Sequence, residues 1–303
     1  MEDILIPFLG ELAALGTAVC WSGTATFFSY SGRLVGSQVV NRTRLLFALL
    51  FLSIAHLLLE GSLFPFHAAG FRWFWFAVSS LLGLVIGDSL LFRAFVLLGP
   101  RLSTLMMATA PIISAILGWL LFGEILAVIE IAGVVLTVAA VGWVVTEKQV
   151  NQSDNEKRDF KRGLWFGLGG AVGQVLNLVT ARYGLVGNYS TISATTIRIF
   201  VALVVLWLLA AVQGDVRQTI AQWRNRQAMP AIIAGSFFGP FLGIWLSLVA
   251  IQYTRLGIAS TLMALPPIIL IPVEYFVLKK PISLRGVMGT VAAIGGVALI
   301  FLA

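Results

Sequence analysis

The sequence predicts an all-α membrane protein with ten transmembrane helices, arranged as two inverted five-helix repeats around a central cavity. Three observations predict this fold: an excess of apolar residues, their division into ten segments of spanning length, and an internal repeat. Of the 303 residues, 59% are hydrophobic and 11% are charged, whereas soluble domains average about 45–50% apolar and about 25% charged residues. One water-soluble core cannot enclose this much apolar surface, so we expect the chain in a membrane.

Charge clusters, prolines and glycines divide the chain into ten apolar segments. Each is close to the ~20 residues that a helix needs to cross the hydrocarbon core, and none shows the alternation of a barrel strand. The segments cover roughly residues 7–30, 38–59, 73–98, 101–122, 125–145, 163–184, 191–212, 230–253, 256–278 and 284–302. No basic residue precedes the first segment, so we expect a retained span and not a cleaved signal peptide.

Basic residues are distributed unequally over the two sides that these segments define. Of the 20 lysines and arginines, only Arg72, Arg182, Arg198 and Arg255 fall on the side that holds the N-terminus. The positive-inside rule then makes the other side cytoplasmic and places both termini outside. The net charge of +7 has this topological explanation and does not indicate a nucleic-acid partner. We expect a multi-pass protein of a bacterial inner membrane.

The widest polar stretch, residues 147–162, divides the chain into a first repeat, 1–146, and a second, 163–303. Residues 103–113 match residues 260–269 with one gap. Because each half has an odd number of segments, the second enters the membrane from the opposite side, as in many secondary transporters, which hold substrate near the midplane. Further pairs keep nearly the same offset: Gly16 with Gly169, Ala18 with Ala171, Tyr30 with Tyr183, Arg44 with Arg198, Gly83 with Gly239, Gly87 with Gly243, Ala94 with Ala250 and Gly133 with Gly289.

Four short motifs carry a family resemblance. They are residues 18–23 (AVCWSG), 87–94 (GDSLLFRA), 111–113 (PII) and 121–124 (LFGE). With the two repeats, the chain resembles the EamA-type family of the drug/metabolite transporter superfamily over nearly its whole length. The resemblance implies a ten-helix basket with a central cavity and export of amino acids or other small metabolites. One position departs from the pattern, because Glu124 ends the fourth helix of the first repeat but Lys280 stands at its counterpart.

A candidate cavity wall combines Trp21 and Thr24 with Gln174 and Asn177. The two amides lie three residues apart on one helical face near mid-membrane, and the repeat matches them to Trp21 and Thr24. Buried amides either bind a zwitterionic substrate or join helices, and the sequence leaves both open. Trp245 on the eighth segment is a further candidate for the lining. Such a wall suits apolar or aromatic amino acids.

Three ionisable residues inside spans are candidates for the pathway, because such groups are costly in a membrane. Asp88, the only aspartate in a span, could take up a proton and couple export to the proton gradient. Alternatively it pairs with Arg93 or caps a break next to Gly87, and takes no part in transport. Arg44 and Arg198 occupy equivalent places in the two halves. They could bind a substrate carboxylate or act as gates, or else extend to the membrane surface or fix a neighbouring helix.

Prolines and glycines inside the spans predict bending and close contact. Pro111, Pro266 and Pro267 are candidate hinges, because proline removes a backbone hydrogen bond and permits bending. Two glycine pairs with a spacing of four residues, on the third and eighth segments, predict close helix packing at the repeat interface.

Other classes of protein are less well supported. Asp88 is alone where a membrane aspartyl protease needs two aspartates, and neither a Gly-x-Ser-Gly nor a Walker motif is present, so we expect no enzyme. A single cysteine, Cys20, and two histidines predict neither a metal site nor a cofactor. The alternative is a flippase for a lipid or lipid-linked head group. A chain that contains both repeats is expected to work as a monomer.

Overall fold

The computed structural model describes residues 8–107, 109–145, 154–266, 268–269 and 284–301. Within these ranges every regular element is a helix. Six helices are long and apolar enough to cross a membrane: Leu9–Val35, Ser37–Glu60, Gly70–Leu98, Phe160–Gly184, Thr191–Gln213 and Ala228–Tyr253. Three shorter apolar helices cover Ala110–Phe122, Val128–Ala140 and Leu284–Ile300. Most of the second half of the expected span at 256–278 lies outside the described residues.

The first half of the chain forms the helices that precede the polar linker. In order they are α1 (Leu9–Val35), α2 (Ser37–Glu60), α3 (Gly70–Ser80), the π-helical η1 (Leu81–Gly87), α4 (Asp88–Met107), α5 (Ala110–Phe122) and α6 (Val128–Val145). Gly36 alone separates α1 from α2, and its φ of 88° requires a residue without a Cβ. The sharp reversal at Gly36 therefore depends on the glycine.

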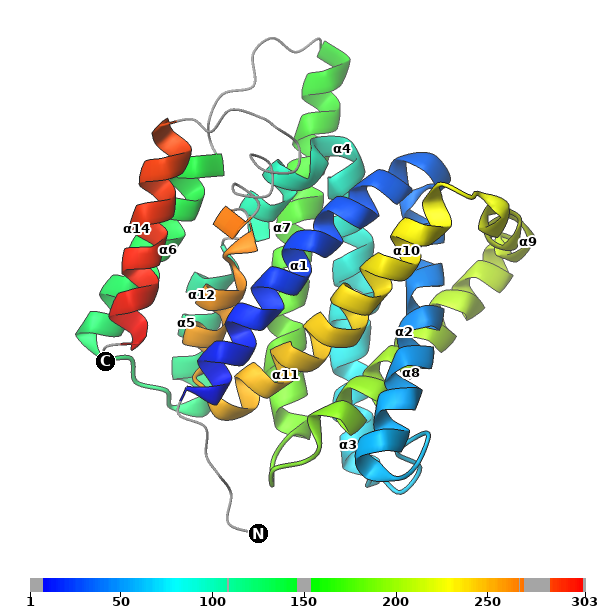
Figure 1. Cartoon of the computed structure of the whole chain (residues 1–303), viewed down its shortest axis with the longest axis horizontal. Helices are drawn as coiled ribbons and strands as arrows, with labels where there is room; N and C mark the ends of the chain where they lie inside the picture. Colours follow the sequence, from blue (N-terminus) through cyan, green and yellow to red (C-terminus); the bar gives the residue numbers. More distant parts are fainter. Residues whose placement is uncertain (1–7, 108, 146–153, 267, 270–283, 302–303) are drawn as a thin grey trace.

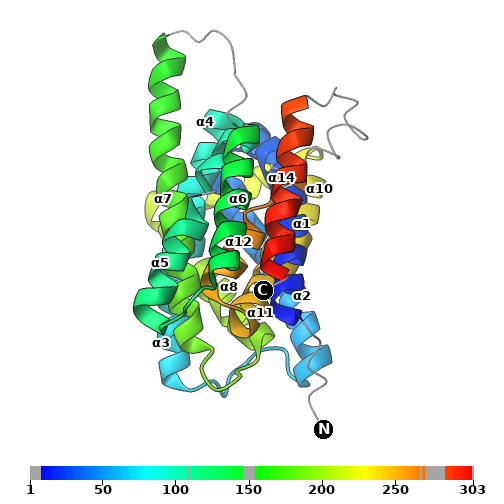
Figure 2. The same cartoon turned by 90° about the vertical axis from the view of Figure 1, so that its left-hand side faces the viewer.

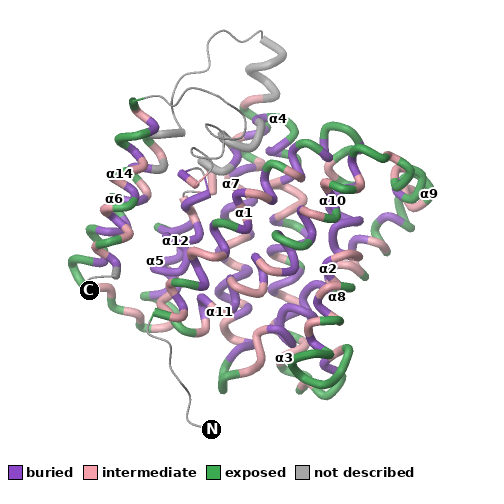
Figure 3. Tube along the Cα trace, viewed as in Figure 1, coloured by how far each residue is buried: buried purple, intermediate pink, exposed green. Residues whose placement is uncertain are grey.

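The second half follows the same order, with an insertion after α8 and with two helices, α11 and α12, at the positions that α4 spans in the first half. It contains α7 (Asp154–Gly184), α8 (Thr191–Gln213), α9 (Val216–Ala221), η2 (Gln222–Arg224), α10 (Ala228–Ser236), the π-helical η3 (Phe237–Gly243), α11 (Ile244–Tyr253), α12 (Leu256–Met263) and α14 (Leu284–Phe301). The short α9 and η2 between the seventh and eighth spans were not expected. α9 is largely exposed at the side of the molecule, whereas α12 is buried throughout (Figure 3).

Two predicted boundaries differ from the structure. The break expected near residues 99–100 lies later, because α4 continues to Met107 and α5 begins at Ala110. Pro111 is the second residue of α5, where its missing N–H leaves no helical bond unmade. The helix that contains the expected span 163–184 also begins earlier, because α7 starts at Asp154, within the polar stretch 147–162, and its first turns extend beyond the neighbouring helices (Figure 2).

The helices pack in pairs that respect the repeat. α1 packs against α10 and α11, while its counterpart α7 packs against α3, η1 and α4. α2 with α8 and α6 with α14 each join two equivalent helices of the two halves, whereas α5 packs against α12, which corresponds in the repeat to the end of α4. α6 and α14 lie side by side at one edge, and α1 runs along α10 and α11 (Figure 1). Exchange of the two halves therefore reproduces the pairings of α1 with those of α7, and the pairs α2–α8 and α6–α14.

The two π-helical segments lie at equivalent positions and contain the repeated glycines. A Cβ on Gly83 of η1 would lie 2.6 Å from the Asn177 side chain, and one on Gly239 of η3 would lie 2.7 Å from the Thr24 side chain. Asn177 and Thr24 are themselves repeat counterparts. The third span thus closely approaches the sixth, and the eighth closely approaches the first, each across the interface between the halves. At both contacts a side chain of the predicted cavity wall, Asn177 or Thr24, lies against the backbone of a glycine.

A further glycine contact, in which a Cβ would meet backbone atoms, yields a test of the fold. A Cβ on Gly173 of α7 would lie 2.8 Å from both Gly87 Cα and Leu82 O, which are backbone atoms that cannot move aside. We expect Gly173→Ala to lower stability by about 1–3 kcal/mol, the usual cost of overpacking. Thermal unfolding of the purified protein in detergent measures this. Gly142→Ala in α6 is the matched control, because its new Cβ would meet no atom within 4 Å. Equal melting of the two variants would contradict the close contact.

Candidate functional site

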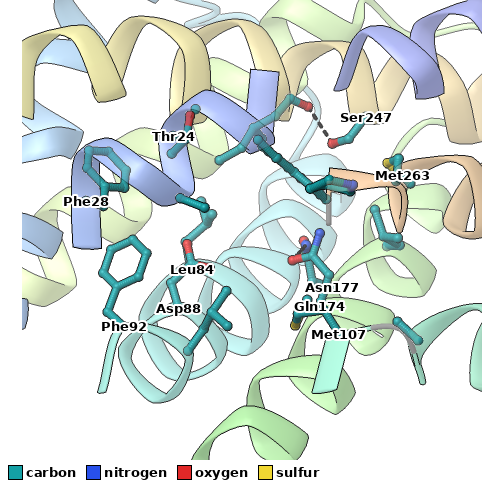
Figure 4. Close-up of a pocket in the computed structure, with 18 of the residues that line it drawn as sticks. Thr24, Phe28, Leu84, Asp88, Phe92, Met107, Gln174, Asn177, Ser247 and Met263 are labelled. Carbon is teal, nitrogen blue, oxygen red and sulfur yellow. Dashed lines mark hydrogen bonds between the residues drawn. The ribbon is translucent and has the colours of Figure 1, made fainter. Parts of the chain in front are cut away.

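A cavity of about 120 Å³ lies between the two halves of the chain. It is lined by α1, α2, η1, α4 and α5 from the first half, and by α7, α8, η3, α11 and α12 from the second. Phe28 and Phe92 lie at one end of it, with ring centroids 5.4 Å apart, and Gln174 and Asn177 lie towards the other (Figure 4). The cavity therefore combines an aromatic end with a polar one.

Most residues proposed from the sequence as substrate contacts are brought together here. Seven of the eight line the cavity: Trp21, Thr24, Arg44, Asp88, Gln174, Asn177 and Arg198. Trp245 does not, because its Nε1 donates a hydrogen bond to Thr191 Oγ1 at 3.0 Å and its ring stacks on Phe241. Ser247, two residues further along α11, lines the cavity instead. Contact with a substrate remains a prediction for all of these residues.

Asp88 is paired with Arg44 in the cavity wall. Arg44 of α2 donates from Nη2 to Asp88 Oδ2 at 2.5 Å and from Nε to Asn41 Oδ1 at 2.9 Å. Its guanidinium also lies 4.7 Å from the Phe92 ring centroid. The alternative pairing of Asp88 with Arg93 is wrong, and Arg93 lies instead over the Phe166 ring. Arg44 does not extend to a membrane surface, because it is buried inside the protein.

Arg198 of α8 is the second buried arginine of the cavity, and it is less fully bound. Its side chain is 1% exposed, and Nη2 donates to Asn177 Oδ1. Nε and Nη1 have no hydrogen-bond partner among the described residues. The guanidinium also interacts electrostatically with Asp88, whose direct hydrogen-bonded partner is Arg44. Two cations therefore share one carboxylate.

Asn177 connects three helices at the polar end of the cavity. Its Oδ1 accepts from Ser79 Oγ of α3 at 2.8 Å and from Arg198 of α8, and its Nδ2 donates to Gln174 Oε1 at 3.3 Å. Of the two roles left open for the amides, joining helices is thus seen for Asn177. Gln174 is half-buried and leaves part of its side chain accessible in the wall.

The candidate hinge prolines lie at helix starts. Pro111 is the second residue of α5, which begins at Ala110, and Pro266 follows the break after α12. Neither kinks a continuous helix, because at a helix start proline costs no backbone hydrogen bond. Both breaks border the cavity, since Ala110 and Pro266 line it. Pro267 lies outside the described residues.

Some lining residues were missed by sequence reasoning. They include Phe28, Phe92, Ser247 and Ser260. Ser260 is the first residue of the repeated stretch in the second half, and Phe28 follows Thr24 by one helical turn. The positions of both in the sequence could therefore have indicated that they line the cavity. Nothing in the pattern distinguished Phe92 or Ser247 from ordinary packing residues, because helical spacing alone does not show which neighbour a face meets.

Glu124, the position at which the repeats differ, has a structural contact. It pairs with Arg182 of α7, and its Oε2 accepts from the backbone N–H of Leu256 at 2.9 Å. Glu124 therefore links the end of α5 to α7 and to the start of α12, away from the cavity lining. Its counterpart Lys280 lies outside the described residues.

The Arg44–Asp88 pair can be tested by its effect on stability. Removing one partner of a buried pair leaves a buried charge, which typically costs about 3–5 kcal/mol. We expect Asp88→Leu and Arg44→Leu each to lower the thermal unfolding midpoint in detergent strongly. The double variant should lose less thermal stability than the two single variants lose in sum, since neither charge of this pair then remains without its partner. Additive losses would show that the two side chains do not interact.

The chain is similar to known proteins in sequence and in fold. A model of the EamA-like transporter family matches the chain twice, over residues 8–146 and 161–302. One solved protein crystal structure superposes with a TM-score of 0.74 at 16% sequence identity, covering 97% of this chain and 96% of the other. That likeness supports the fold alone. No curated protein matches the chain. Because the two family matches together span most of the sequence, the chain belongs to the EamA-like transporter family and is a multi-pass membrane protein.

Proposed function

We propose that this protein is a secondary transporter that exports small metabolites, above all amino acids or related compounds, by alternating access. The observation that carries the proposal is the position of the cavity, which lies between the two repeats and takes polar side chains from equivalent places in both. In transporters with inverted repeats, the solute site lies at that interface. The proposal includes the expected orientation, with the linker between the halves in the cytoplasm, a monomer as the working unit, and the cell membrane as the location.

The size and lining of the cavity favour a small solute. Pockets for drug-sized ligands measure about 300–1,000 Å³, whereas this cavity measures about 120 Å³. A metabolite with a short apolar or aromatic body fits such a space, with Phe28 and Phe92 beside the body and the polar side chains beside its charged groups. A lipid head group with its glycerol and chains needs more room and a lateral opening, so the flippase function has less support.

The helix breaks support alternation. The ends of α4 and α12 each give way to a new helical segment next to the cavity, and a proline lies in the first turn after each break. Since these two breaks are repeat counterparts, opening at one on one side and at the other on the opposite side would expose the cavity to each side in turn.

Transport into proteoliposomes tests the function and its driving force. A panel of labelled amino acids is offered to the purified protein with and without an imposed pH gradient. We expect uptake of at least one, and comparison with Asp88→Asn separates two driving forces. Gradient-driven uptake that requires Asp88 indicates proton coupling, and gradient-independent uptake that survives the change indicates facilitated diffusion. Scrambling of labelled lipid with no solute uptake would overturn the proposal in favour of a flippase.

A matched control removes the effect of losing an ion pair as such. Asp215 pairs with Arg42 at 3.0 Å outside the cavity lining. Asp215→Asn makes the same chemical change in a buried-arginine pair without altering the cavity. We expect Asp215→Asn to leave gradient-driven uptake almost unchanged. If it reduces this uptake as much as Asp88→Asn does, the loss in Asp88→Asn comes from lower stability and not from lost proton coupling.

The prolines at the breaks give a kinetic prediction. Pro111→Ala and Pro266→Ala allow helix to form across the breaks, so we expect the rate of solute exchange to fall severalfold while solute affinity changes little. Pro230→Ala is the control, because Pro230 also lies in the first turn of a helix, α10, but is exposed and does not line the cavity. Rates and affinities come from counterflow and binding assays. A loss of affinity at unchanged maximal rate would contradict a hinge role.

A further inference from the structure

We propose that Arg198 binds a carboxylate of the transported solute, so that the cavity accepts small carboxylates and rejects amines of the same shape. This inference rests on the proposed function, because the carboxylate belongs to the transported solute. It names the chemical class of the solute and the atoms that recognise it.

The first step is the incomplete bonding of the Arg198 guanidinium. An arginine has five N–H donors, and those on Nε and Nη1 have no partner among the described residues, although the side chain is 1% exposed. Buried charges are normally paired, because an isolated one is costly. A guanidinium that lines a cavity and has two nitrogens without a hydrogen bond therefore indicates a site for an anionic group, and carboxylates match the planar donors of arginine.

The second step is a comparison with Arg44, the repeat counterpart of Arg198. Arg44 obtains one bond from Asn41, three residues earlier, and one from Asp88, the first residue after η1. At the corresponding places in the second half stand Thr195 and Ile244. Neither supplies a carboxylate, and the hydroxyl of Thr195 donates to Thr191 O at 2.7 Å.

The fold thus places an arginine at equivalent positions of the two halves and a carboxylate beside only one of them. Ile244, like Asp88, is the first residue after a π-helical segment, and both line the cavity. A solute carboxylate bound to Arg198 would take the place that the Asp88 carboxylate takes beside Arg44. Two cations in the cavity would then face two carboxylates, and the local charge would balance.

The third step concerns the rest of the solute. Asp88 is the one carboxylate among the described residues that line the cavity, and it already binds Arg44, so these residues offer no free carboxylate to an ammonium group. An amine on the solute is therefore optional, whereas the carboxylate is required. Phe28, Phe92 and Leu84 supply an apolar wall for a short body, and an apolar cavity of comparable size, 150 Å³, is enough for benzene.

Two matched sets of three compounds test this requirement. L-valine is compared with 3-methylbutanoate, which lacks the amine, and with isobutylamine, which lacks the carboxylate. L-phenylalanine, 3-phenylpropionate and phenethylamine form the second set. Binding to the purified protein in detergent is measured by the rise in the thermal unfolding midpoint with ligand concentration. We expect at least one acid from these sets to bind, and its amine analogue to bind at least tenfold more weakly.

Variants assign the requirement to Arg198. Arg198→Gln should abolish the preference for acids over amines, and Arg198→Lys should retain part of it. Asn177→Asp should abolish acid binding while the protein stays folded, because it places a carboxylate beside Arg198 Nη2. Arg217→Gln removes an exposed positive charge on α9 and should leave the preference unchanged, which controls for net charge.

Three results would overturn the inference: amines that bind as tightly as the acids, unchanged acid binding by Arg198→Gln, or no binding by any of the acids. These results differ from failure of the transporter proposal. Transport of amines or neutral solutes by the wild-type protein would retain a transporter and overturn the role of Arg198. Acid binding through Arg198 with no transport of any solute would support the site and overturn the transporter.

Discussion

The close approach of helices at glycine is the constraint on which the cavity depends. α7 can lie against η1 and α4 only because Gly83, Gly87 and Gly173 present no side chains there, and α1 meets η3 in the same way at Gly239. These contacts cross from one half to the other, so they hold the halves together and set the distance between the side chains that face the cavity. Larger residues at these positions would separate the helices and remove the wall.

Charge is the second constraint, because the cavity lies inside a membrane protein where water cannot compensate buried ions. Arg44 is satisfied by an amide, a carboxylate and an aromatic face. Arg198 donates a hydrogen bond to the Asn177 amide and interacts electrostatically with Asp88, which Arg44 already binds. This difference between two equivalent residues gives a symmetric fold an asymmetric site. A symmetric scaffold suits alternation between two states, and an asymmetric site gives a solute one preferred orientation within it.

Much of the fold and of the cavity followed from the sequence, because both depend on the repeat. The alignment of the halves paired Trp21 and Thr24 with Gln174 and Asn177, and Arg44 with Arg198. A site between the halves that contained one member of a pair was therefore expected to contain the other. The failures have local causes. Trp245 was placed in the cavity from its span alone, yet it turns towards α8, and no periodic pattern shows which neighbour a given face meets.

The partner of Asp88 shows a further limit of sequence patterns. Arg93 follows it by five residues on the same helix, whereas Arg44 lies on another helix and meets it only through tertiary packing. The π-helical segment before Asp88 changes the phase of the helix relative to a regular α-helix, so the direction of the carboxylate could not be extrapolated from the apolar pattern. The same segment recurs before Ile244. Two equivalent distortions therefore direct one carboxylate and one aliphatic side chain into the same cavity, and the missing carboxylate becomes visible only when the halves are compared in three dimensions.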